Sequence, residues 1–147
     1  MQKRNIVIIN VYRPPDCSPE KYISPLSELG PKLIEVANPM TNSSIITADQ
    51  NSSIIDWQME TADRGTNENQ VQANVFLQFA QEQCLQQYIE EPTRKNNILD
   101  VFLTNNDQLT RQIIITKTSM SDQNIIQIET NIKFEKRNKT TKLRKAT

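Results

Sequence analysis

Apolar residues lie along the chain in short runs, and the spacing within each run predicts a secondary-structure element. The run from Asn5 to Tyr12 is rich in β-branched residues and almost continuous, which predicts a strand buried on both faces. Four more strands are predicted over residues 43–51, 97–105, 111–118 and 124–134. The last of these alternates cleanly between apolar and polar residues from Ile126 to Phe134.

Two longer segments have helical spacing instead. Residues 18–39 begin with Ser-Pro-Glu, which suits the cap and first turn of a helix, and a break or kink is expected at Gly30-Pro31. Residues 70–88 predict a second amphipathic helix. Its apolar side is expected to contain Val71, Val75, Phe79 and Leu85. The order β-α-β-α-β-β-β predicts an α/β fold with layers around a mixed sheet.

Composition is that of an ordinary globular domain. A chain of 147 residues with 36% hydrophobic and 23% charged residues can bury one real core. No apolar stretch approaches a membrane span. With only two glycines, the chain has no glycine-rich phosphate loop, so no nucleotide cofactor or other small-molecule cofactor is expected. We expect an intracellular protein, nuclear or cytoplasmic, in which Cys17 and Cys84 are free thiols.

The formal net charge of zero hides an uneven distribution. Residues 133–147 hold seven basic residues and one acidic residue, which leaves 10 basic and 16 acidic residues in the 132 before them. A basic tail on an acidic body can contact phosphate, and a solvated linker is the alternative interpretation. The sequence therefore predicts a folded domain over residues 5–132, followed by a basic tail or linker over 133–147.

Three aspartates fall at informative places. Asp49 ends the second predicted strand, Asp122 comes just before the last, and Asp100 lies inside an apolar strand. A buried carboxylate is costly without a partner, so Asp100 calls for a specific role. Carboxylates gathered at the ends of strands can bind Mg²⁺ together with phosphate oxygens. The alternative is that these aspartates only cap turns.

Six short motifs in a fixed order favour the first interpretation: VYRPP, ADQN, DW, EPTR, NILDVFLTN and SDQN. In this order and at these gaps they resemble the endonuclease/exonuclease/phosphatase family. The nearest members are the endonuclease domains of non-LTR (jockey-like) retrotransposons, distant relatives of apurinic endonucleases and DNase I. The resemblance covers Ile6 to about Ile132. It implies a partial DNase I-like layered α/β sandwich, a Mg²⁺-dependent phosphodiester hydrolase acting as a DNA endonuclease, and DNA as the partner.

The resemblance also implies roles for individual residues. Tyr12 matches a tyrosine at a strand end whose hydroxyl helps position the scissile phosphate. Asp49 and Asn51 match an Asp-x-Asn pair, in which the aspartate orients or deprotonates the attacking water and the asparagine holds that water or a phosphate oxygen. Thr93 matches, more loosely, a hydroxyl that contacts phosphate.

The chain departs from the family at the last motif. Ser121 and Asp122 match the start of a Ser-Asp-His motif, with Ser121 at the substrate and Asp122 near the metal, and Asp100 matches the aspartate that orients its histidine. Gln123 stands where that histidine belongs, and the chain contains no histidine. A glutamine amide can donate a hydrogen bond but does not titrate near neutral pH. Losing a general acid/base typically lowers the rate by roughly 10²–10⁴-fold.

Two further departures point the same way. Ala48 replaces a family glycine, and the metal-binding Glu and active-site Asn that precede the VYRPP strand have no counterpart in residues 1–4. The chain is therefore expected to be an N-terminally truncated copy, the C-terminal part of such a domain, with degraded or absent activity. The alternatives are a non-catalytic remnant or weak nucleic-acid-binding module of a retrotransposon-derived protein, and a structural module unrelated to nucleases.

Overall fold

The computed structural model describes residues 6–36, 42–62 and 67–133, so Asn5 and nearly all of the predicted basic tail lie outside the described residues. The elements run in the order β1 (Ile6–Tyr12), α1 (Pro19–Val36), β2 (Ser43–Asp49), α2 (Asn67–Glu82), β3 (Gln86–Gln87), β4 (Asp100–Thr104), the short 3₁₀ helix η1 (Asp107–Leu109), β5 (Thr110–Thr116) and β6 (Ile125–Thr130). Neither α1 nor α2 has the length and apolar character of a membrane span.

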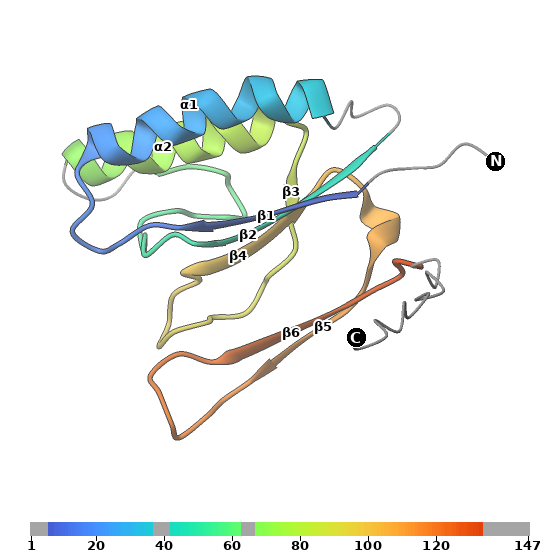
Figure 1. The fold of residues 1–147 in the computed structure, drawn as a ribbon. Helices are drawn as coiled ribbons and strands as arrows, with labels where there is room; N and C mark the ends of the chain where they lie inside the picture. The colour runs from blue at the N-terminus through green and yellow to red at the C-terminus, as the bar shows by residue number, and fades with distance from the viewer. Residues whose placement is uncertain (1–5, 37–41, 63–66, 134–147) are drawn as a thin grey trace, which may run out of the picture.

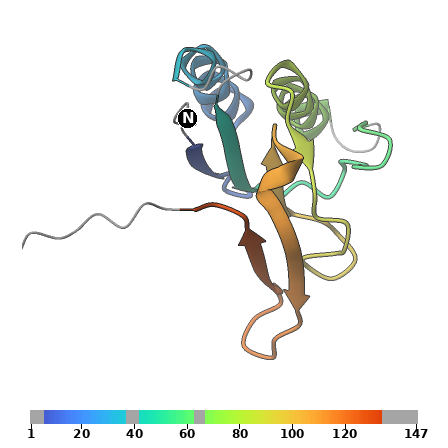
Figure 2. The same cartoon turned by 90° about the vertical axis from the view of Figure 1, so that its right-hand side faces the viewer.

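Four strands form a mixed sheet in the order β1-β2-β4-β3, and β5 pairs with β6 in a separate antiparallel hairpin. β1 and β2 are parallel, as expected for two strands joined by a crossover helix, whereas β4 is antiparallel to both β2 and β3. Figures 1 and 2 show α1 and α2 on one face of this sheet and the hairpin on the other. The predicted α/β class with a mixed sheet is therefore confirmed.

The helix layer contains the larger core. Tyr22, Leu26 and Leu33 of α1 are buried against Phe76 of α2 and Ile46 of β2. α1 continues through Gly30 and Pro31, so the expected break at that point is wrong. Proline removes one backbone donor from the helix, but apolar residues on both sides of it remain packed in the core and hold the helix together.

The hairpin layer contains a second core on the opposite face of the sheet. Ile45 of β2, Ile89, Phe102 of β4 and Leu109 are buried there. Partly buried isoleucines of the hairpin pack against them; these are Ile113, Ile115, Ile126 and Ile128. The alternation predicted for the last strand thus places every second residue of β6 against the sheet.

Two further expectations are corrected. β1 is an edge strand, with 61% of Ile8 exposed, although a strand buried on both faces was predicted. Residues of β1 alternate between the helix layer and an open face, and the β-branched residues on both faces conceal that alternation. The second helix ends at Glu82, because Cys84 adopts a left-handed backbone (φ 54°) and the chain turns into β3. Its Val71 is 48% exposed, and the buried face is instead formed by Ala73, Phe76, Leu77 and Ala80, together with Phe79.

Candidate functional site

Three of the predicted site residues are aligned across neighbouring strands. Tyr12 is the register partner of Asp49 in the parallel pair, and Asp49 is the register partner of Asp100 in the antiparallel pair. Ala48 and Val101 point into the helix-side core, so Asp49 and Asp100 project from the opposite face. Figure 1 shows that the ends of β1 and β2 lie at the same end of the molecule as the loop joining β5 and β6.

This arrangement alters the protonation of the Asp49 carboxyl. Partial burial raises the pKa of Asp49, and the negative charge of Asp100 raises it further. Hydrogen bonding from Asn51, whose backbone N–H lies 3.2 Å from Oδ1 of Asp49, and the positive charge of Arg94 lower that pKa and oppose the increase. Asp49 is therefore a more basic carboxylate than an exposed aspartate.

Asn51 is fixed beside Asp49 by the chain end of β1. Its Nδ2 donates to the carbonyl of Arg13 at 2.8 Å, and its backbone is left-handed (φ 46°), a conformation that asparagine tolerates better than most residues. The Arg13 side chain is buried and donates through Nη1 to the carbonyls of Gln50 (2.9 Å) and Asn51 (3.2 Å). Its Nη2 donates to Gln72 of α2. Arg13 therefore ties the loop after β2 to the helix layer.

Thr93 holds the turn that leads into β4. Its side chain is completely buried, and its Oγ1 accepts hydrogen bonds from the backbone N–H groups of Leu99 (3.0 Å) and Asp100 (3.1 Å). These bonds fix the turn that leads into β4 and so set the position of Asp100. The contact between the Thr93 hydroxyl and phosphate stays a prediction.

The loop before β6 joins the site through Arg94. Nε and Nη2 of Arg94 lie 2.7 and 2.6 Å from Oδ2 of Asp122, and the backbone of Arg94 forms an antiparallel bridge with Gln123. Ser121 is exposed, and its Oγ accepts from the backbone N–H of Gln123 at 3.2 Å. The structure thus brings Asp122 and Gln123 next to a residue whose charge acts on Asp49.

Arg13 and Arg94 lie in two of the six motifs, but no role was predicted for either. Arg13 is the arginine of VYRPP and Arg94 that of EPTR. Each follows a residue that was considered for chemistry, and each contacts the predicted site from a distant part of the chain. The signal that could have identified them is that each motif has an arginine directly after a candidate site residue.

The acidic side chains of this region can be compared with the ligands that Mg²⁺ requires. The described residues include no group of three or more His, Cys, Asp or Glu side chains placed to hold a metal. Mg²⁺ commonly uses one or two carboxylates and completes its shell with water and phosphate oxygens. Asp100, whose charge acts on Asp49, can supply one such carboxylate. Asp122 has one oxygen paired with Arg94, and its predicted place near a metal stays a prediction.

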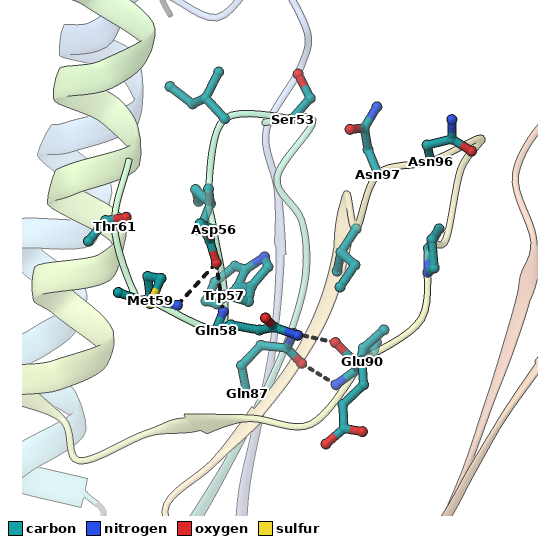
Figure 3. A pocket seen from close by; sticks show the side chains of 15 residues that line it. Ser53, Asp56, Trp57, Gln58, Met59, Thr61, Gln87, Glu90, Asn96 and Asn97 are labelled. Atoms are coloured by element: carbon teal, nitrogen blue, oxygen red, sulfur yellow. Dashed lines mark hydrogen bonds between the residues drawn. The ribbon is translucent and has the colours of Figure 1, made fainter. Parts of the chain in front are cut away.

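Two surface hollows adjoin this region. The smaller, which we call the polar hollow, has a volume of about 340 Å³ and is lined in part by Arg13, Asn51, Arg94 and Lys95. The larger, which we call the Trp57 cleft, has a volume of about 940 Å³ and lies between residues 53–61 and residues 87–98 (Figure 3). Ser53 and Asn97 line both, so the two hollows are contiguous.

A mixed sheet with helices on one face, a β-hairpin on the other and acidic residues at one end defines a DNase I-like α/β protein. A family model described as endonuclease-reverse transcriptase matches residues 6–127, and the chain belongs to this family. The predicted resemblance to retrotransposon endonucleases is therefore confirmed.

A solved structure supports the same fold. The endonuclease domain of TRAS1, a telomere-specific non-LTR retrotransposon, is similar to this chain with a TM-score of 0.56 and 18% sequence identity. The match covers 84% of this chain and 56% of the TRAS1 chain, so this chain spans little more than half of that structure. A comparison with curated proteins gives no match.

Proposed function

We propose that the end of the sheet carrying Tyr12, Asp49 and Asp100 binds a DNA phosphodiester and, with Mg²⁺, hydrolyses it slowly. The observation that carries this proposal is the register of the three strands, which aligns a phenol and two carboxylates on one face. The similarity to a retrotransposon endonuclease domain supports DNA as the substrate class. The proposed reaction is attack of water on phosphorus, with departure of a sugar oxygen.

In this proposal Asp49 accepts a proton from the attacking water. Its pKa, raised by burial and by Asp100, makes its carboxylate a better proton acceptor than an exposed aspartate. Asn51, held in place by the Arg13 carbonyl, orients the water or a phosphate oxygen. Tyr12 is 62% exposed, so its hydroxyl can donate to a phosphate oxygen from the open side.

Asp100 would hold the Mg²⁺ ion, with Asp122 proposed to lie near it, which leaves the Asp49 carboxylate to accept the proton. When bound, the ion would neutralise charge on the phosphate and lower the pKa of coordinated water. Ser121 is a proposed substrate contact from the exposed loop. Thr93, completely buried, is proposed to act on the substrate through Asp100, whose backbone N–H it binds. The basic segment 133–147 is proposed to add sequence-independent phosphate contacts.

A second candidate function is binding of nucleic acid without hydrolysis. Gln123 favours it, because an amide cannot protonate the leaving oxygen, and the remaining family position beside it, Asp122, is paired with Arg94. Arg94 would then serve the binding of phosphate rather than its cleavage. Both candidates use the same surface and differ only in turnover.

Plasmid nicking and DNA binding in Mg²⁺ distinguish these candidates. Wild type, Asp49→Ala and Asp107→Ala are compared, since Asp107 is an exposed aspartate beyond the opposite end of β4. We expect slow nicking by wild type and by Asp107→Ala, and none by Asp49→Ala. DNA binding without nicking in wild type would establish the second candidate. Absence of both, or equal nicking by Asp49→Ala, would contradict the proposal.

A further inference from the structure

The polar hollow and the Trp57 cleft have opposite chemistry. The polar hollow is lined by Arg94 and Lys95, and no acidic residue lines it among the described residues. The Trp57 cleft includes Asp56 and Glu90 and, within the same described ranges, no basic residue. An anionic group is therefore favoured in the first and disfavoured in the second. An uncharged group is therefore favoured in the Trp57 cleft.

The walls of the Trp57 cleft are suited to an aromatic heterocycle. Ile54, Ile89 and Ile98 provide apolar surface, and Figure 3 shows Trp57 projecting between the two segments that form the walls. The indole packs edge-on against Phe76, with ring centroids 6.2 Å apart, which fixes its orientation. A cleft of about 940 Å³ is large enough for a nucleoside.

The Trp57 indole also carries a polar atom without a partner. Its Nε1 is buried and makes no hydrogen bond with any described residue. Buried donors are almost always paired in folded proteins, so this N–H, on a residue that lines the cleft, is available to an acceptor supplied from outside. Nucleobases carry ring nitrogens and carbonyl oxygens that can fill this role.

We propose that the two hollows together bind one unpaired nucleotide of a nucleic-acid strand. Its phosphate lies in the polar hollow near Arg94 and Lys95, its sugar crosses at Ser53 and Asn97, and its base enters the Trp57 cleft. In this proposal the exposed amide of Asn97 bonds the edge of the base, and the buried indole N–H donates to it when the ring moves toward the cleft. This inference rests on the proposed function, since it describes the strand that the carboxylate site would act upon.

The single tryptophan of the chain makes the cleft directly observable. Trp57 fluorescence is measured during titration with a short single-stranded oligothymidylate, and with an oligonucleotide of equal length whose bases are replaced by abasic spacers. The two probes carry the same phosphates. We expect quenching by the first probe alone, and affinity for the abasic probe weaker by on the order of tenfold, as for loss of base stacking.

Matched variants separate the two halves of the proposed site. Asn97→Leu is expected to weaken binding of the oligothymidylate more than binding of the abasic probe, whereas Asn74→Leu, at an exposed position of α2, changes neither. Arg94→Ala is expected to weaken both probes equally. Saturating oligothymidylate without quenching, equal affinity for the two probes, or no binding of either would overturn the inference. Asp49-dependent nicking, assayed on the same preparations, reports independently on the proposed function.

Discussion

Asp49 and Asp100 are register partners on the antiparallel strands β2 and β4, so two carboxylates lie side by side on one face of the sheet. Like charges placed opposite each other weaken a strand pair. Here the effect is visible as a raised pKa of Asp49, to which burial contributes most and the charge of Asp100 contributes next. Carboxyl groups with shifted pKa values are common at functional sites, because catalysis uses charges in places where they lower the stability of the fold.

Asp49→Asn is expected to stabilise the protein at neutral pH. A pKa raised in the folded state means that the folded protein holds this proton more tightly than the unfolded chain. Stability is therefore lost as the pH rises from the ordinary aspartate pKa through the raised one. The amide removes that loss and keeps an oxygen for the N–H of Asn51. Thermal unfolding from acid to neutral pH should show a small gain that grows with pH.

Asp107→Asn is the control for this measurement, because Asp107 is exposed and distant from Asp100 in the fold. It is expected to show no such gain. A lower unfolding temperature of Asp49→Asn at neutral pH, or a gain that is largest in acid, would contradict the assigned electrostatics.

Thr93→Val is expected to destabilise the protein by about 1–3 kcal/mol, because one buried and one partly buried N–H group lose their acceptor. Thr110→Val provides a control of identical chemistry. The Thr110 hydroxyl is buried without a partner in the described part of the chain, so its removal should be neutral or stabilising. Urea unfolding of both variants measures the difference. Equal destabilisation by the two changes would show that Thr93 does not anchor Asp100 in this way.

Arg94→Ala is expected to lower DNA affinity clearly while lowering the free energy of unfolding only slightly. The Arg94 and Asp122 side chains are 35% and 49% exposed, and such an ion pair contributes about 0.2–1 kcal/mol. Loss of one phosphate contact should reduce the salt dependence of DNA binding by about one unit of log K against log salt. Arg111→Ala, at an exposed position of β5, is the control. An equal loss of affinity in both variants would place the phosphate contact elsewhere.

Much of this site follows from local sequence signals. Polar residues that end apolar runs mark the ends of strands, and the motif order assigned Tyr12, Asp49 and Asp100 to three strands that do become neighbours. The apolar face of α1 was also predictable, because Tyr22, Leu26 and Leu33 keep helical spacing.

The contributions of Arg13 and Arg94 could not be predicted, because they depend on contacts that no local pattern encodes. Arg13 contacts Gln50 and Gln72, and Arg94 pairs with Asp122, all far away along the chain. The edge position of β1 was missed for a related reason. A run of isoleucine and valine satisfies a buried strand and an edge strand equally, and only pairing with other strands distinguishes them.

Gln123→His tests the central claim most directly. The claim is that the residues at the strand ends and the loop held by Arg94 form one site for a phosphodiester. This site lacks an imidazole that can exchange a proton near neutral pH. The rate of Mg²⁺-dependent plasmid nicking is compared in wild type, Gln123→His and Gln127→His, the last an exposed position of β6. We predict that histidine at position 123 alone raises the rate by about 10²-fold or more, and that adding Asp49→Ala abolishes the gain. An unchanged rate in Gln123→His would contradict the account.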